Sequence, residues 1–117
     1  MERLLIELNK VPGVIGSFVV APDGIVVASD FASEINDELM GALTSSIINA
    51  TEKATRKMDL GALQGFIVET DRNRIFFQAT RSGFLVCLAG PEANLGLVRV
   101  ELRAASERLN TLGLGVS

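Results

Sequence analysis

Three apolar runs in the second half of the chain are separated by turns of only three residues. "LQGFIVET" at 63–70 leads through "DRN" into "RIFFQAT" at 74–80, and "RSG" then leads into "FLVCLAG" at 84–90. Because a parallel connection needs a crossover of about a dozen residues or more, turns this short make neighbouring strands antiparallel. This part of the chain therefore predicts an antiparallel meander.

Two further strands are predicted before the meander. Residues 14–21, "VIGSFVVA", are apolar at nearly every position, as in a strand that is covered on both faces. "PDG" at 22–24 is a tight-turn sequence, so "IVVAS" at 25–29 is expected to return as the second strand of a hairpin. Strands that are apolar on both faces require helices on both sides of one sheet.

Three helices are predicted to provide that cover. Residues 2–10 place three leucines on one stripe, residues 36–58 form a long helix that Asn36 caps, and a last helix opens at Pro91 and Glu92. In the last helix an apolar repeat of three and four residues runs through Leu95, Val98, Leu102, Ala105, Leu109 and Leu112. The order α-β-β-α-β-β-β-α predicts an α+β fold, with residues 1–117 forming one domain.

The composition disfavours several classes of function. The net charge is −3, which argues against general affinity for nucleic acid, since that needs a basic face. The chain has no histidine, the usual general base and the commonest metal ligand. No pair of nucleophile and base, no metal-ligand spacing and no phosphate-binding loop is recognisable, so no catalytic residue, metal or cofactor is predicted.

The single cysteine and the absence of long apolar segments bear on location. Cys87 lies within an apolar run, where a small buried side chain is expected rather than a reactive thiol. One cysteine makes no internal disulfide, which is consistent with a reducing compartment. No run approaches the roughly 18 apolar residues of a membrane helix, and the N-terminus lacks the features of a signal peptide. A cytoplasmic location is expected.

The long helix has two faces that both lack the charge of a solvated surface. At about 100° per residue, one side gathers the larger apolar residues and is expected to cover the sheet. The members of this side are Leu39, Met40, Leu43, Ile47, Ala50, Ala54 and Met58. The opposite side consists mostly of small or polar residues, namely Glu38, Gly41, Ser45, Ile48, Asn49, Glu52 and Arg56.

The small-residue side is interpreted as a dimer interface. Small side chains let two helix backbones approach closely, and Ile48 adds an apolar contact near the middle. In an antiparallel pair with its two-fold axis near residues 47 and 48, Glu38 of one chain would lie level with Arg56 of the other. The alternative, a neutral solvated face with one isolated isoleucine, remains open, because isolated exposed apolar residues are normal.

The strand at 63–70 is the second candidate for self-association. Its glutamine, glycine and glutamate make it the most polar of the strands, which favours an edge position. An unpaired edge containing Gly65, Phe66, Ile67 and Val68 would be prone to aggregation unless it is paired or covered. Pairing with the same strand of a second copy would solve that problem.

Two segments resemble the Roadblock/LC7 family. "PEANLGLVRVELRAASERL" at 91–109 is similar to the family's last helix, and "VPGVIGSFVVAPDGIVVAS" at 11–29 is similar to its opening helix-to-hairpin segment. The resemblance implies a five-stranded antiparallel sheet with the long helix on one face and the two terminal helices on the other. It also implies homodimers or heterodimers in which the third strands pair edge to edge and the long helices pack antiparallel.

The function implied by the resemblance is that of a binding module. Family members regulate or scaffold small Ras-like GTPases, or attach to dynein intermediate chains. Docking of a GTPase on the paired long helices would place Glu52, Lys53 and Arg56 near a partner. The expected function is therefore a non-enzymatic homodimeric regulator or scaffold of a small Ras-like GTPase. The alternatives are a structural adaptor that is indifferent to nucleotide and a domain that binds a small ligand.

Overall fold

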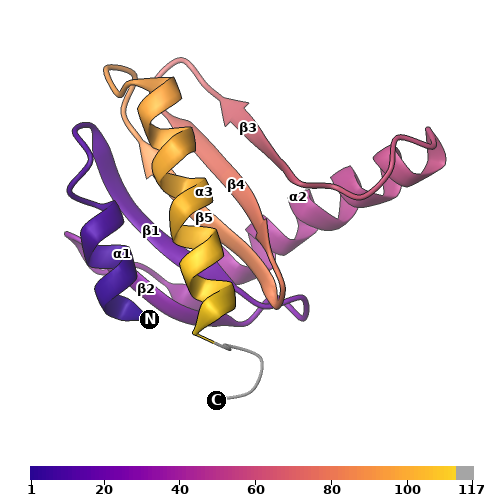
Figure 1. Ribbon diagram of the computed structural model, residues 1–117, viewed down its shortest axis with the longest axis horizontal. Coiled ribbons are helices and arrows are strands. Elements are labelled where there is room, and N and C mark those ends of the chain that lie inside the picture. Colours follow the sequence, from indigo (N-terminus) through magenta and orange to yellow (C-terminus); the bar gives the residue numbers. More distant parts are fainter. Residues whose placement is uncertain (113–117) are drawn as a thin grey trace.

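The computed structural model describes residues 1–112 and has the predicted order of elements (Figure 1). Most boundaries lie within one or two residues of the predicted ones, but the last helix begins later than expected. The elements are α1 (Glu2–Leu8), β1 (Val14–Val20), β2 (Val26–Phe31), α2 (Asp37–Lys57), β3 (Gly65–Glu69), β4 (Arg74–Thr80), β5 (Gly83–Ala89) and α3 (Leu95–Thr111).

The start of α3 is set by Asn94 rather than by Pro91. The side-chain oxygen of Asn94 accepts a hydrogen bond from the backbone N–H of Leu97 at 3.0 Å, which satisfies one of the free donors of the first turn. Before it, the N–H of Ala93 donates to the carbonyl of Gly90 and closes a separate turn. The segment that contains Pro91 is thus a loop between β5 and the helix.

All five strands form one antiparallel sheet in the order β2-β1-β5-β4-β3. The pairing of β1 with β5 joins the N-terminal hairpin to the meander, so β5 is the central strand and β1 and β4 flank it. β2 and β3 form the two edges. The prediction that the strand at 63–70 is an edge is confirmed.

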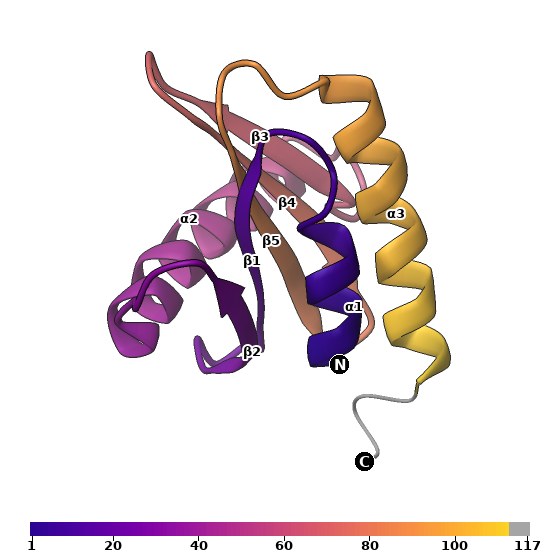
Figure 2. The same cartoon turned by 90° about the vertical axis from the view of Figure 1, so that its left-hand side faces the viewer.

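Helices cover both faces of the sheet, in the arrangement that the family resemblance implied. Figure 2 shows α1 and α3 on one face and α2 on the other. The α1/α3 side of the core buries Leu5, Leu85 and Val98, whereas Phe18 and Phe77 are buried on the α2 side. Cys87 is fully buried in the α1/α3 part of the core, as the sequence indicated.

A buried polar contact attaches the end of α1 to the sheet. Ser17, which is completely buried, donates through its hydroxyl to the Asn9 side-chain oxygen at 2.8 Å. The Asn9 amide in turn donates to the backbone carbonyl and the carboxylate of Asp30 on β2, at 2.8 and 2.7 Å. Each polar group therefore has a partner, which removes the cost of burying it.

Candidate functional site

The long helix α2 presents to the sheet the side that was expected to face outward. Gly41, Thr44 and Ile48 are buried against the sheet. By contrast, Leu39 and Leu43 are each 54% exposed and Ile47 is 36% exposed. Of the larger apolar residues expected to cover the sheet, Met40 is half-buried against the α2 side of the core, but the expectation was wrong for the others.

Close approach of α2 to the β1–β2 hairpin explains the reversal. The backbone of Gly41 lies directly against the carbonyl of Gly24 in the hairpin turn, leaving no room there for a side chain. One turn further on, the buried hydroxyl of Thr44 donates to the carbonyl of Met40 at 2.7 Å and so needs no other partner. Ile48 then reaches the core beside Phe18 and Phe77. The small residues thus allow a helix to pack on a sheet rather than on a second helix.

The other residues predicted for the helix interface are divided by this orientation. Ser45 and Glu52 are half-buried and, together with Ile48 and Asn49, line a cavity of about 270 Å³ beside the two neighbouring hairpin turns. Glu38, Asn49 and Arg56 are exposed, as is Lys53. Gly41 and Ile48 are committed to the chain's own core, so they are not free to form an interface between chains.

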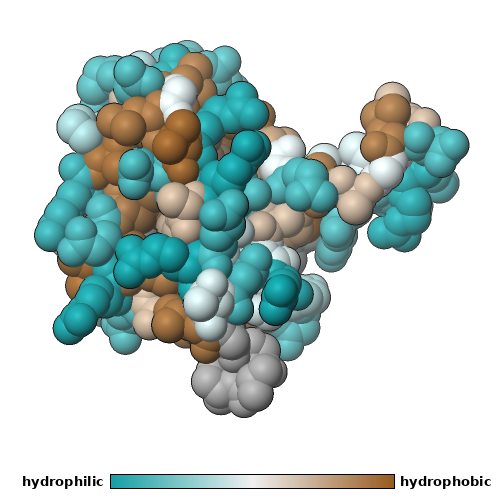
Figure 3. Space-filling model, viewed as in Figure 1, coloured by the Kyte–Doolittle hydropathy of each residue, from teal (hydrophilic) through white to brown (hydrophobic). Residues whose placement is uncertain are grey.

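The exposed side of α2 carries an apolar stripe that we call the outer stripe. Its members share one side of the helix, at spacings of three and four residues, and none is buried. They are Leu39, Leu43, Ile47, Ala50, Ala54 and Met58. Figure 1 shows that the second half of α2 and the following loop reach beyond the sheet, and Figure 3 shows this arm carrying both hydrophobic and hydrophilic surface.

The middle of strand β3 is apolar, and the strand lies largely outside the cover of the helices. α2 packs chiefly on β1 and β2, and α3 packs on β4 and β5. The ring of Phe66 stacks on Phe77 of β4 with ring centroids 4.3 Å apart, and Val68 lies on the same face. Ile67 points to the opposite face, toward α3. Within residues 1–112, no strand pairs with the outer edge of β3.

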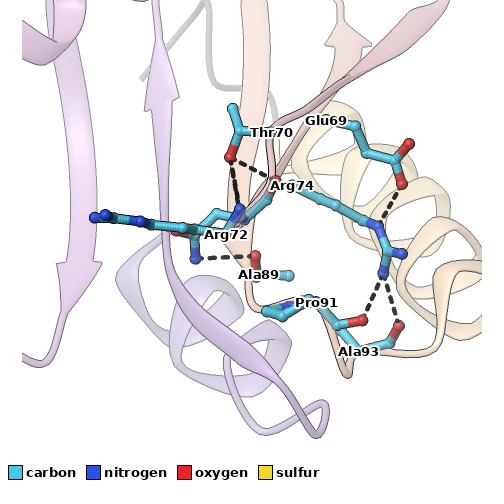
Figure 4. Close-up of polar contacts among 8 residues, drawn as sticks. Glu69, Thr70, Arg72, Arg74, Ala89, Pro91 and Ala93 are labelled. Carbon is cyan, nitrogen blue, oxygen red and sulfur yellow. Dashed lines mark hydrogen bonds and ion pairs between the residues drawn. The ribbon is translucent and has the colours of Figure 1, made fainter.

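The hydrogen bonds at the turn between β3 and β4 have a structural role (Figure 4). Arg74 donates to the Glu69 carboxylate at 2.7 Å and to the carbonyls of Pro91 and Ala93 at 3.0 and 3.4 Å. The Thr70 hydroxyl accepts from the backbone N–H of Asn73 at 3.0 Å. The Arg74 bonds hold the loop before α3 against the end of β3, and the Thr70 bond closes the turn.

Three further properties of the described residues concern the thiol, metal binding and membrane insertion. Burial raises the pKa of the Cys87 thiol to about 12, so the thiol stays protonated at neutral pH. Among residues 1–112, no group of three acidic or thiol side chains is placed to hold a metal ion. Over the same residues, no helix is both long enough and apolar enough to cross a membrane.

The chain belongs to the Roadblock/LC7 family. The model of the Roadblock/LC7 domain matches residues 1–89, and the resemblance inferred from the sequence is thereby confirmed. The matched range ends before α3, although the segment at 91–109 was one of the two on which the resemblance rested. The likenesses to complete proteins extend over that helix as well.

Similar proteins come from archaea and bacteria. An uncharacterized protein of Methanocaldococcus jannaschii, MJ1340, is 33% identical over 112 residues, which are 96% of this chain and 98% of the relative. A Roadblock/LC7 domain from Streptomyces avermitilis superposes with a TM-score of 0.90 at 21% identity and covers 97% of this chain and 98% of its own. Myxococcus xanthus MglB has a TM-score of 0.91 at 18% identity, with coverages of 98% and 95%. The two structures establish a shared fold.

Proposed function

We propose that this chain is a non-enzymatic, homodimeric, cytoplasmic module of one domain that regulates or scaffolds a small Ras-like GTPase. Membership of the Roadblock/LC7 family supports this proposal in general. The observation that carries the dimer is the outer stripe of α2, because an apolar stripe on an exposed helix needs a partner.

The spacing of the outer stripe is symmetric about a point between residues 48 and 49. In an antiparallel pair of α2 helices with the two-fold axis at this point, Leu39 lies level with Met58 of the partner subunit. Leu43 then lies level with the partner's Ala54, and Ile47 with the partner's Ala50. Each large side chain thus meets a small or flexible one, as an isologous interface requires.

This interface replaces the one expected from the sequence. The outer stripe, rather than Gly41 and Ile48, forms the contact between the two helices. Glu38 and Arg56 lie about 150° around the helix from the stripe, so a cross-chain ion pair between them is not part of the proposal. The outer edge of β3, which contains Phe66, Ile67 and Val68, would form the second contact. There the two copies of β3 would pair across the two-fold axis and join the two sheets into one.

The paired helices would serve as the docking platform for the GTPase. Lys53 and Arg56 are exposed on α2 outside the outer stripe, so they remain accessible when the helices pair. Glu52 is half-buried and contributes only its outer part. Binding that favours one nucleotide-dependent shape of the GTPase would shift its population toward that shape.

Sedimentation velocity tests the dimer. Leu43→Glu places a charge at the centre of the outer stripe, so we expect a folded monomer. Asn49→Glu, at an exposed position of the same helix about 130° around from the middle of the stripe, serves as the matched control and should remain dimeric. A Leu43→Glu protein that sediments as the wild type does would refute the interface.

Affinity capture from a lysate of the source organism tests the function. The wild-type dimer is used as bait with a GTP analogue, with GDP and without nucleotide, and bound proteins are read by mass spectrometry. A Ras-like GTPase enriched in one nucleotide state supports the regulator. Equal capture in all three conditions favours the nucleotide-indifferent adaptor, and absence of any GTPase in every condition contradicts the proposal.

A further inference from the structure

A groove runs between α3 and the edge strand β3, on the face of the sheet opposite α2. It has a cavity volume of about 330 Å³. Ile67 and Phe76 contribute apolar surface from the strands, and Leu102 contributes it from the helix. Arg99 and Arg103 line the α3 side, and Figure 3 shows hydrophilic side chains along the side of α3 that is turned toward β3.

No salt bridge within the described part of the chain accounts for the two arginines. Both are exposed, and within residues 1–112 neither takes part in an ion pair. Glu107 lies one turn beyond Arg103 but does not pair with it. Like charges four residues apart on a helix repel one another by a few tenths of a kcal/mol, roughly, so the pair is not explained by stability.

The groove has a rigid frame. α3 runs along β4, with its Ser106 hydroxyl bonded to the carbonyl of Ala79 at 2.8 Å. At the other end, Arg74 ties the loop before α3 to Glu69 of β3 (Figure 4). The arginine-bearing wall and the strand edge are therefore held at a fixed spacing, which favours a preformed site.

The dimer proposed above would join two such grooves into one cleft. A two-fold axis between paired β3 strands places both α3 helices on the same face, with Arg99 and Arg103 of each chain on opposite walls. Strands are about 4.8 Å apart, so the two β4 strands would be about 14 Å apart and the two β5 strands about 24 Å apart. Since α3 packs on β4 and β5, the α3 axes fall between these limits.

This width fits one helix. Packed helices lie about 8–10 Å apart, so a single helix between two walls needs about 16–20 Å. A second helix side by side would not fit. Apolar side chains of that helix would contact Ile67 and Phe76, and its carboxylates would receive the guanidinium groups, which bind carboxylates through two parallel hydrogen bonds.

We propose that the homodimer binds one acidic, amphipathic helix of a partner protein in this cleft, with Arg99 and Arg103 of both chains as the residues that recognise its carboxylates. The inference rests on the homodimer of the proposed function and adds a second docking face to it. Because the chain as a whole carries a net charge of −3, the attraction is local and short-ranged.

A designed peptide provides the probe. It is about 18 residues long, roughly 27 Å as a helix, and repeats Glu, Ala and Leu so that one side is apolar and the other acidic. A second peptide has Lys in place of every Glu. Fluorescence anisotropy and titration calorimetry should show one Glu peptide bound per two chains, and binding of the Lys peptide should be weaker by about tenfold or more.

Matched double variants locate the site. Arg99→Glu/Arg103→Glu should weaken binding of the Glu peptide by about tenfold or more, and Arg99→Gln/Arg103→Gln, a milder change, should weaken it less. Arg81→Glu/Arg108→Glu changes the charge equally at exposed arginines outside the groove and should leave binding nearly unchanged. Equal losses in both Glu variants, equal binding of the two peptides, or displacement by a single-stranded oligonucleotide would overturn the proposal.

Stoichiometry and sedimentation separate this proposal from the one on which it rests. If the variants sediment as dimers and the Glu peptide does not bind to the wild type, the cleft is refuted while the proposed dimer stands. Two peptides per dimer would likewise refute a shared cleft. If the wild type sediments as a monomer, the proposed dimer fails, and the cleft fails with it.

Discussion

Gly41 in α2 and Gly24 in the β1–β2 turn lie backbone against backbone, and this contact sets how α2 is oriented on the sheet. A Cβ atom at Gly41 would overlap the carbonyl oxygen of Gly24. Because the helix approaches the hairpin at this point, the side of α2 that contains Gly41 must face inward. The larger apolar side chains on the other side are then left at the surface, where they form the outer stripe.

Replacing Gly41 by alanine should destabilise the protein, although alanine is the better helix former. Propensity alone favours Gly41→Ala by about 1 kcal/mol, but forcing a methyl group into a closed contact costs about 1–3 kcal/mol. We therefore expect a net loss of up to about 2 kcal/mol in the free energy of unfolding. Urea denaturation at one fixed protein concentration measures it.

Ser46→Ala is the control for that experiment. Ser46 is exposed on the same helix, so only the propensity changes, and the free energy of unfolding should rise by about 0.5 kcal/mol. Opposite signs for the two substitutions would support the contact. A gain in both would show that the backbone of α2 does not need the glycine.

Neighbouring isoleucines in α2 should respond differently to truncation. Ile48 is 5% exposed in the core, so Ile48→Ala should lower the free energy of unfolding by about 2–4 kcal/mol. Ile47 lies on the outer stripe, so Ile47→Ala should lower the free energy of unfolding of the monomer by less than about 1 kcal/mol. It should also weaken the dimer. Denaturation of both variants at protein concentrations where the wild type is monomeric separates the two effects. Equal losses would contradict the orientation of α2.

Much of the fold could be predicted from local patterns. The turns "DRN" and "RSG" required antiparallel neighbours, and the apolar repeat through Val98 and Leu109 identified the buried side of α3. The start of that helix was placed at Pro91, and proline is common in a first turn, but Asn94, which caps the N–H of Leu97, is the stronger start signal. Weighing the cap above the proline would have located the boundary.

The orientation of α2 could not be obtained from periodicity. A hydrophobic stripe identifies the side of a helix that is removed from water, but it does not say whether the chain's own sheet or a second chain removes it. Gly41 satisfies a close contact in either case. The role of Arg99 and Arg103 was missed for a related reason, since two charges on the polar side of an amphipathic helix are ordinary until the neighbouring edge strand is placed beside them.

Cys87 should be inert to thiol reagents in the native protein. The thiolate is the reactive form, and burial raises the pKa of the Cys87 thiol to about 12. At pH 8 we expect Ellman's reagent to modify native protein only through unfolding, and to modify protein in 6 M guanidinium within the mixing time. Rapid labelling of the native state would show that β5 is not closed over by α3.

The same thiol makes stability depend on pH. The pKa is higher in the folded than in the unfolded chain, so its contribution is complete below about pH 8.5 and is lost as the pH rises further. Between pH 8 and 10 the free energy of unfolding should fall by about 2 kcal/mol from this group. Cys87→Ala lacks the group and should show a fall that is smaller by this amount. Identical pH profiles for the two proteins would contradict the burial of the thiol.

The register of the proposed helix pair can be tested by cross-linking. An antiparallel pair centred between residues 48 and 49 places Leu43 opposite the partner's Ala54. In Leu43→Cys/Ala54→Cys the two thiols on different chains should therefore come within the range of a disulfide, about 4.4–6.8 Å between Cα atoms. Within one chain, the 11 residues that separate them span roughly 16 Å of helix, so an internal disulfide is excluded. Mild oxidation should yield covalent dimers on a non-reducing gel.

Two controls make the cross-link specific. Ala42→Cys/Lys53→Cys moves each thiol one residue toward the N-terminus, which turns it about 100° away from the partner while both positions stay exposed. Leu43→Cys alone has no thiol opposite it in an antiparallel pair. In a parallel pair, the substituted position of one chain would lie opposite the same position of the other chain. We expect little covalent dimer in either control, and Cys87 is too deeply buried to contribute. Strong cross-linking of Leu43→Cys alone would indicate a parallel helix pair instead of the antiparallel one. Equal cross-linking of all three variants would show that the two helices do not pair in one defined register.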